Sequence, residues 1–435
     1  MLKTGCAKVD ITPDFPVFLR GYAGRNQLST GIEDRLSAGV MVLVQGRVRQ
    51  LLLTLDSLGI GIRQCERLMR DLRAATGFRE EQIYLACSHT HFAPGLDDYC
   101  VIWPDGELEQ GRYPAEPAYY PLLLDRLVSG IRSALDQLEP VEVEEATVQA
   151  PGTVFNRRTI RRDNGMVDTN YLYPEHPEDY IFQEVDPRLS VWRFRRKDGS
   201  LQAIIGCFGC HAVTGGENFY GVSADYPGQF QAIVQREFGC PGLFLLGTAG
   251  DVVPLQRNGE SRRDIGEILV RSIRLAERTF RKTGPFALAA RTAMVPLTLR
   301  VKCPRDRAAQ VLEDAFAENR RKFDLEKAYM TTCAAEFALT YPEDRVELPI
   351  HLLRLGSRVL VGLPFEVLTE IGLRLRRACP EAVLTSITGG YEGYLPLAKE
   401  HRRGGYEAAT GSRFHRRAGD DVLAAAIKAV REFNA

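Results

Sequence analysis

The sequence has no excess of charge of either sign and no long apolar run. Its 56 lysines and arginines balance 56 aspartates and glutamates, so no overall field would attract nucleic acid or an anionic membrane. No segment reaches the roughly 18 uninterrupted apolar residues of a membrane-spanning helix, and the N-terminal MLKTGCAKVDITPDF lacks the apolar core of a signal peptide. We therefore expect a cytoplasmic protein with no nucleic-acid partner and no stable membrane insertion.

The sequence also lacks a dense cysteine framework. Its 10 cysteines are scattered over 435 residues, mostly among apolar neighbours, so we expect reduced thiols. The string Cys207-Phe208-Gly209-Cys210-His211 has the spacing of a haem-attachment or thiolate site. Haem attachment needs export, and a zinc–thiolate site needs a second cysteine pair that the chain does not offer. We interpret Cys207 and Cys210 as buried structural residues.

No internal repeat or low-complexity linker divides the chain, so we treat residues 1–435 as a single domain, with 284–300 as the best candidate for a subdomain junction. β-Branched or leucine-rich runs predict buried strands at 40–44, 50–55, 83–86, 201–208, 243–246 and 359–361. Amphipathic stretches predict helices at 63–76, 120–137, 228–238, 264–281, 304–321 and 365–379. This alternation indicates an α/β fold with a mixed, largely buried β-sheet flanked by helices. Segments 97–121 and 164–187 are weakly periodic, and we expect surface excursions that could wall a pocket.

Three of the seven histidines follow predicted strands directly. His89 and His91 come after IYLAC, where an extended His-x-His segment would direct both imidazoles to one side. His211 closes the run LQAIIGCF. Ligands bind at the carboxyl ends of strands in α/β sheets, so these histidines are candidates for a shared metal or water site.

Other candidate residues are less informative when each is considered alone. Asp251 follows the predicted strand LFLLGTAG, but an aspartate there is also typical of a turn or a helix N-terminus. Glu366 is expected in the first turn of an amphipathic helix, where the helix dipole favours a carboxylate with or without a metal. Tyr394 and Tyr406 lie in glycine-rich segments, where tyrosines are usually ordinary loop aromatics.

The order of the short motifs resembles the catalytic domain of the neutral (non-lysosomal) ceramidase family. The motifs are GCAKVDITPDF, RGYAGR, GIEDRLSAGVMVL, SHTHFAPG, Asn156-Arg157, CHAVT, TAGDVVP, LPFE and YEGYLP. Each motif is short, and the specificity comes from their order along nearly the whole chain. The resemblance implies a zinc-dependent hydrolase that uses a metal-activated water to cleave an N-acyl amide bond.

The resemblance also implies roles for individual residues. His89, His211, Glu366 and Tyr394 would hold one Zn²⁺ per chain, a set in which two imidazoles and a carboxylate suit catalytic zinc and the tyrosine is unusual. His91, Arg157 and Tyr406 would be catalytic and face the substrate, together with Asn156. Asp251 would orient or deprotonate the water.

One position departs from the family pattern, because Val253 stands where the family's Gly-Asp-x-Ser-Pro motif has serine. A valine has no hydroxyl for attack or hydrogen bonding, so we expect a small or medium acylated substrate, with ceramide as one candidate. The resemblance implies the catalytic domain alone, and we expect none of the C-terminal β-sandwich that the family commonly carries. An esterase or deacetylase on a soluble acylated substrate, or a metal-stabilised binding protein without turnover, remains an alternative. The sequence does not determine the acyl group or the oligomeric state.

Overall fold

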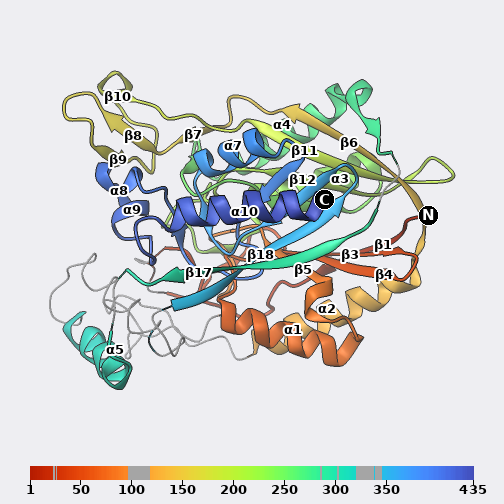
Figure 1. The fold of residues 1–435 in the computed structure, drawn as a ribbon, viewed down its shortest axis with the longest axis horizontal. Coiled ribbons are helices and arrows are strands. Elements are labelled where there is room, and N and C mark those ends of the chain that lie inside the picture. Colours follow the sequence, from red (N-terminus) through yellow and green to blue (C-terminus); the bar gives the residue numbers. More distant parts are fainter. Residues whose placement is uncertain are drawn as a thin grey trace.

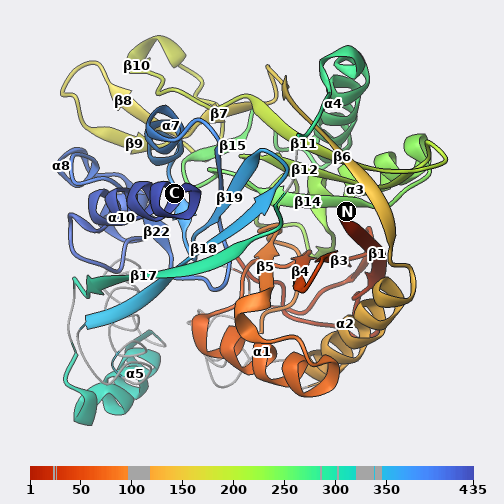
Figure 2. The same cartoon turned by 45° about the vertical axis from the view of Figure 1, so that its right-hand side comes forward.

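A computed structural model of the chain describes residues 1–22, 25, 27–96, 118–284, 287–300, 303–319, 338 and 345–435. Two stacked β-sheets form the centre of the described part, and helices cover their outer faces (Figures 1 and 2).

The larger sheet has nine strands in the order β14-β12-β11-β6-β1-β3-β4-β5, with β16 also paired to β6. Its strands are β1 (Lys3–Asp10), β3 (Ser37–Gln45), β4 (Val48–Leu55), β5 (Ile83–Cys87), β6 (Glu139–Gln149), β11 (Arg188–Arg196), β12 (Leu201–Phe208), β14 (Gly242–Leu246) and β16 (Arg281–Lys282). Most pairs are antiparallel, but β4–β5 and β12–β14 are parallel. The sheet is therefore mixed.

The second sheet has the order β17-β18-β19-β21. Its strands are β17 (Ala290–Thr298), β18 (Arg345–Leu355), β19 (Arg358–Gly362) and β21 (Ala382–Thr385). Short paired strands surround the two sheets: β2 (Gly31–Ile32), β7 (Val154–Asn156), β8 (Arg158–Arg161), β9 (Val167–Thr169), β10 (Tyr180–Ile181), β13 (Gly221–Val222), β15 (Val252–Pro254), β20 (Glu366–Val367) and β22 (Tyr394–Leu395).

Both faces of the large sheet are buried, because successive side chains of a strand point to opposite faces. Val40 and Val42 pack in one apolar cluster, whereas Met41 packs in another that also contains Leu353 and Leu360 of the second sheet. The first cluster includes residues of α1 (Ile62–Thr76), α2 (Tyr119–Asp136), α3 (Asp225–Phe238) and α4 (Ser261–Leu275). The far face of the second sheet packs against α7 (Thr369–Ala378) and α10 (Ala418–Asn434). This four-layer arrangement explains the near-continuous apolar runs of the central strands.

The six predicted strands are confirmed as β3, β4, β5, β12, β14 and β19, and the predicted fold class is confirmed with them. Helices are also confirmed as α1, α2, α3 and α5 (Arg305–Asn319). The helix predicted over 264–281 was wrong in its last six residues: α4 ends at Leu275, and Arg281 and Lys282 pair with β6 as strand β16.

The helix predicted over 365–379 was also wrong at its start. Glu366 lies in β20, where its N–H donates to the carbonyl of Gly393 at 2.9 Å. The helix α7 begins only at Thr369, whose N–H donates to the carboxylate of Asp251 at 2.8 Å. The backbone N–H of Glu366 is engaged in the pairing of β20 with β22, so it is not available for a helical hydrogen bond. Tertiary contacts thus override the amphipathic pattern of the sequence.

Two predicted segments have mixed outcomes. Of the excursion predicted over 97–121, residues 97–117 lie outside the described residues, and 119–121 begin α2. The excursion predicted over 164–187 forms β9, β10 and the connections around them. The extended run within 284–300 forms β17, which opens the second sheet. Whether that range marks a domain boundary stays a prediction.

Within the described ranges, none of the helices combines the length and apolarity needed to cross a bilayer. The eight described cysteines form no disulfide with one another, and Cys207 and Cys210 are buried as expected. Burial raises the pKa of both thiols, which suits a packing role and not a reactive one.

His351 on β18 provides a test of pH-dependent stability. Its Nδ1 lies 3.2 Å from Thr292 Oγ1, and burial lowers its pKa to about 4 from the ordinary histidine value of 6.5. In the unfolded chain His351 binds a proton below pH ~6.5, whereas in the folded chain it does so only below pH ~4. The contribution of the neutral His351 to the free energy of unfolding is therefore fully present above pH ~6.5 and is lost as the pH falls toward ~4. Replacing His351 with Gln should reduce the loss of unfolding free energy between pH 7 and pH 5 by about 1–2 kcal/mol.

Urea unfolding at the two pH values measures this loss. His176→Gln, at an exposed histidine, serves as the control and should behave as the native protein does. An H351Q variant with the native pH dependence would contradict the assignment.

Candidate active site

Strand ends from both sheets meet at one place in the fold. The N–H of Cys87, at the end of β5, donates to the carbonyl of Ile387, which follows β21. The N–H of Ser386 donates to the carbonyl of Leu246, at the end of β14. Thr90 forms a bridge with Ala212 beyond β12. The segments that carry the predicted histidines are therefore held next to each other by backbone hydrogen bonds.

The three strand-end histidines converge as predicted, but the first pair does so by a different backbone route. The rings of His89 and His91 lie 5.0 Å apart, and the ring of His211 lies 4.9 Å from that of His89. The prediction of an extended His-x-His segment was wrong, because His89 has φ 62°. The left-handed turn at this residue is what brings both imidazoles to one site.

Backbone carbonyls orient two of these imidazoles. His89 Nδ1 lies 2.6 Å from the carbonyl oxygen of Leu58, and His211 Nδ1 lies 2.5 Å from that of Ala249. A carbonyl oxygen only accepts, so each Nδ1 carries the proton and each Nε2 presents a lone pair. Metal-binding histidines are commonly oriented in this way.

The two Nε2 atoms face one carboxylate oxygen. Glu366 Oε2 lies 3.1 Å from His89 Nε2 and 2.9 Å from His211 Nε2. The first contact is close but lies outside hydrogen-bond geometry, so His89 Nε2 has no hydrogen-bond partner among the described residues. Tyr394 Oη lies 3.3 Å from His211 Nε2. The parallel pairing of β20 with β22 places Glu366 directly beside Tyr394.

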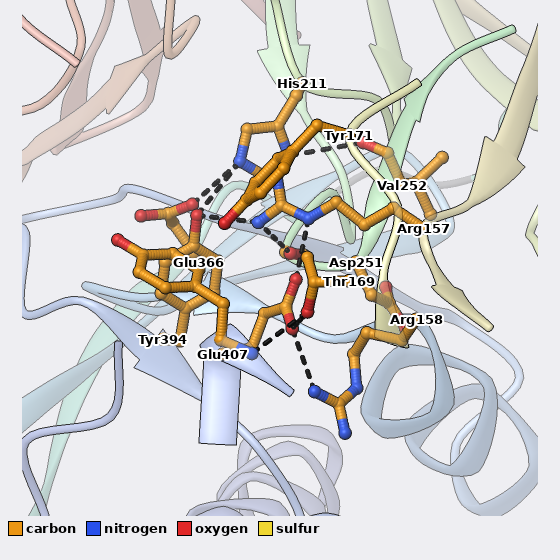
Figure 3. Close-up of polar contacts among 12 residues, drawn as sticks. Arg157, Arg158, Thr169, Tyr171, His211, Asp251, Val252, Glu366, Tyr394 and Glu407 are labelled. Atoms are coloured by element: carbon orange, nitrogen blue, oxygen red, sulfur yellow. Dashed lines mark hydrogen bonds and ion pairs between the residues drawn. The ribbon is translucent and has the colours of Figure 1, made fainter. Parts of the chain in front are cut away.

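This donor set fits zinc. Zinc takes imidazole and carboxylate ligands at about 2.0–2.2 Å, so tetrahedral ligands lie about 3.3–3.5 Å from one another. The separations around Glu366 Oε2 and His211 Nε2 are close to that range. The donors come from four separate segments, with His211, Glu366 and Tyr394 drawn together in Figure 3.

His91 belongs to the same buried group, since ligand atoms of His89, His91 and His211 lie within 4.8 Å of one another. Neither ring nitrogen of His91 has a hydrogen-bond partner in the described part of the chain. The three histidines could thus hold a metal ion by themselves. We favour Glu366 over His91 as a ligand, because the carboxylate oxygen lies 3.1 Å from His89 Nε2 and 2.9 Å from His211 Nε2.

The electrostatics of the site favour a neutral His211 and an ionised Glu366. Burial, followed by the charge of Arg157, lowers the pKa of His211 to about 4. Burial and the neighbouring imidazoles also lower the pKa of His91 well below its usual value. Burial alone would raise the pKa of Glu366, but the imidazoles of His89 and His211 outweigh it and hold that pKa well below the usual range. Neutral imidazoles and an ionised carboxylate are the forms that bind a cation.

Arg157 and Tyr406 lie against the Tyr394 side of this cluster. Arg157 Nη2 donates to Tyr394 Oη at 2.9 Å, and the guanidinium lies 5.4 Å from the centre of the Tyr171 ring (Figure 3). The rings of Tyr394 and Tyr406 are 5.5 Å apart. Burial raises the pKa of Tyr406, so its phenol stays protonated as a hydrogen-bond donor.

Asp251 and Asn156 are held by other protein groups. Asp251 Oδ1 accepts from the N–H and the hydroxyl of Thr369 at 2.8 and 2.7 Å, and Oδ2 accepts from Asn156 Nδ2 at 2.8 Å. Asn156 Nδ2 also donates to the carbonyl of Glu184. The carboxylate thus stabilises the start of α7, as a turn or cap aspartate would. Its predicted role with the water, and the predicted substrate contact of Asn156, stay predictions.

Several residues of the site were missed by the sequence reasoning. Tyr391 donates to Glu366 Oε1 at 2.6 Å. The buried guanidinium of Arg25 donates to the carbonyl of His91. Glu407 and Arg158 form ion pairs beside Arg157. Arg158 and Glu407 are the sequence neighbours of the predicted site residues Arg157 and Tyr406. Arg25 lies in the motif RGYAGR and Tyr391 in YEGYLP. Closeness in sequence to the predicted residues could therefore have indicated all four.

Val253 lies in the core and not on a reactive surface. It is fully buried on β15, opposite Phe155 of β7, and packs in a small apolar cluster with Val213. Val253 therefore contributes apolar packing at a position where the family's serine would carry a hydroxyl.

Comparison with known proteins places the chain in a family. A family model described as neutral/alkaline non-lysosomal ceramidase, N-terminal, matches residues 2–239, more than half of the chain. The chain belongs to this ceramidase family. The family's N-terminal region thus includes His89, His91, Arg157 and His211.

Relatives and solved structures of the ceramidase family agree with this assignment. Neutral ceramidase of Pseudomonas aeruginosa is 21% identical over 473 aligned positions, covering 93% of this chain and 68% of the relative. Neutral ceramidase B of Dictyostelium discoideum is 25% identical over 276 residues, and the match spans only 36% of that protein. The crystal structure of the Pseudomonas aeruginosa neutral ceramidase superposes with a TM-score of 0.77 at 19% identity, covering 99% of this chain and 75% of that chain. The fold is thus that of a neutral ceramidase.

Proposed function

We propose that this protein is a zinc-dependent hydrolase that cleaves an N-acyl amide bond. The observation that carries the proposal is the convergence of His89 Nε2 and His211 Nε2 on the carboxylate of Glu366, with both Nδ1 atoms held by backbone carbonyls. Membership of the ceramidase family supports an amide bond as the target.

His89, His211, Glu366 and Tyr394 would hold one zinc ion. A zinc ion in such a site acidifies a water and polarises the carbonyl oxygen of the substrate. The ligand side chains are at most 7% exposed, and exclusion of water strengthens the electrostatic interactions at the site.

Three further side chains would act on the substrate. Arg157 carries a permanent charge, because its pKa is raised well above the usual value: burial would lower it, but Tyr394 and Glu407 outweigh burial. Its guanidinium and the phenol of Tyr406 would donate to the oxygen that becomes negative when the carbonyl carbon turns tetrahedral. His91, neutral at pH 7 because burial lowers its pKa, would take up a proton and pass it to the leaving nitrogen. Asp251 would position the backbone of Arg157, since the carbonyl of Asp251 accepts from the Arg157 N–H at 2.8 Å.

The substrate is proposed to be a small or medium acylated molecule. The relatives are named neutral ceramidases, which makes ceramide one candidate, and Val253 provides no hydroxyl for a serine-dependent contact. The same groups would also serve an ester or an N-acetyl group, because both pass through a tetrahedral oxyanion.

The experiment is metal analysis coupled to a matched substrate panel. The purified chain should contain one zinc per molecule and hydrolyse N-acyl amides in a panel that includes ceramide and the corresponding esters. Removal of zinc with a chelator should abolish hydrolysis, and added zinc should restore it.

Full activity in zinc-free protein would overturn the zinc proposal. Stoichiometric zinc without turnover of any amide, ester or N-acetyl substrate would instead favour a metal-stabilised binding protein.

A further inference from the structure

The buried carboxylate of Glu407 bridges two consecutive arginines. Glu407 Oε1 accepts from Arg157 Nε at 2.6 Å, and Oε2 accepts from Arg158 Nη1 at 2.8 Å (Figure 3). Glu407 and Arg158 are 0% exposed, and Arg157 is 4% exposed. Two charged partners in a region without solvent fix the carboxylate from both sides.

The outer end of this bridge is anchored further. Arg158 Nη2 donates to Glu400 Oε2 and to the carbonyl of Gly404, each at 2.9 Å. Thr169 Oγ1 donates to Glu407 Oε2 at 3.2 Å and accepts from the N–H of Tyr406 at 2.9 Å. The bridge therefore ties β8 and β9 to the helices α8 (Glu400–Arg403) and α9 (Tyr406–Ala409).

The inner end of the bridge reaches the zinc ligands. Arg157 uses Nε for Glu407, which leaves Nη2 directed at Tyr394 Oη and at the carbonyl of Gly250. A guanidinium is a rigid planar fork, so fixing Nε fixes the direction of the other nitrogens. Without Glu407, rotation about the side-chain bonds of Arg157 would no longer be restricted by a charged partner.

A buried ion bridge of this kind contributes little net stability. Taking four charged groups out of water costs about as much as their mutual attraction returns, so an apolar replacement is often equally stable. Burial would raise the pKa of Glu407, but Arg157 and Arg158 outweigh it and keep the carboxylate ionised. The geometric role of the bridge is therefore a better explanation for its presence than stability.

We propose that Glu407 is a positioning residue that holds the Arg157 guanidinium against Tyr394 and the substrate carbonyl, with Arg158 as its fixed support. The proposal rests on the hydrolase function proposed above. Glu407 itself does not touch the reacting atoms.

The test is Glu407→Gln in the full chain. Glutamine has the same shape but no charge, and its amide nitrogen cannot accept from an arginine. We expect kcat to fall about tenfold to a hundredfold, as is usual for residues that orient a reactive group. KM should change by less than kcat, and zinc content per folded chain should stay at the native value.

The matched control is Glu144→Gln, since Glu144 likewise bridges two arginines, Arg193 and Arg195, but on β6. It should leave kcat unchanged. If E407Q fails to fold, the triple variant R158M/E400Q/E407Q removes the outer arginine and also neutralises Glu400, the other buried carboxylate that pairs with Arg158. That variant should fold and still show the reduced kcat.

A crystal structure of the variant gives a readout that does not depend on activity. In E407Q the Arg157 guanidinium should have left Tyr394 Oη. If it stays in its native place, or if the folded variant retains kcat within twofold of native, the positioning role is wrong. If the native chain hydrolyses nothing but Arg157 still moves in the variant, the hydrolase function fails and the positioning role stands.

Discussion

Glu366→Gln is expected to abolish both zinc binding and hydrolysis. The carboxylate lies 3.1 Å from His89 Nε2 and 2.9 Å from His211 Nε2, and a neutral amide is a poor zinc ligand. Losing several kcal/mol of transition-state stabilisation corresponds to a decrease in kcat/KM on the order of a thousandfold or more. Zinc analysis and amide hydrolysis measured on the same preparation check both parts of the expectation.

Two comparisons make this result specific. Glu370→Gln, four residues further on, changes a partly exposed carboxylate that pairs with Arg374 and Lys399, and it should keep zinc and activity. His91→Ala should lose activity but keep zinc, because His91 is assigned to the substrate and not to the metal. Stoichiometric zinc in E366Q, or loss of zinc in H91A, would instead assign the three histidines as the ligands.

The second large effect is expected for Asp251→Asn, on stability as well as rate. The carboxylate accepts three hydrogen bonds from Thr369 and Asn156 and is 4% exposed. In the variant the amide NH₂ would replace one accepting oxygen and face either the donors of Thr369 or the donor of Asn156. An unsatisfied buried donor and a lost charged acceptor together cost about 2–4 kcal/mol.

Urea unfolding with and without zinc measures this cost. Asp264→Asn, at an exposed position in the first turn of α4, should stay within about 0.5 kcal/mol of native. We also expect kcat to fall, since the Asp251 carbonyl holds the backbone of Arg157. Native stability in D251N would show that the network around α7 is dispensable.

Local patterns were sufficient where one segment carries its own signal. The apolar runs of β4, β5 and β12 predicted strands because both faces of these strands are buried. His89 and His211 were recognisable because each follows such a run within a few residues. Val253 could be recognised as a departure from the family motif, but only its packing against Phe155 and Val213 explains it.

Patterns failed where a distant segment decides the local structure. Glu366 was expected in a helix because the following residues are amphipathic, yet pairing with Tyr394 in β22 makes it a strand residue. The Asp251 carboxylate then sets the start of α7 from 118 positions away in sequence. The bridge between Arg157 and Glu407 spans 250 positions, and no local periodicity encodes such a partner.

By itself, the sequence determined the α/β class, the central strands and several of the groups that meet at the site, whereas Arg158, Tyr391 and Glu407 were found only in the structure. Only the tertiary structure decided which atoms of those groups face one another, and which charges are buried and paired. The reason is physical: secondary structure follows from the periodicity of neighbouring side chains, whereas the ligand geometry depends on how strand ends from two separate sheets are packed together.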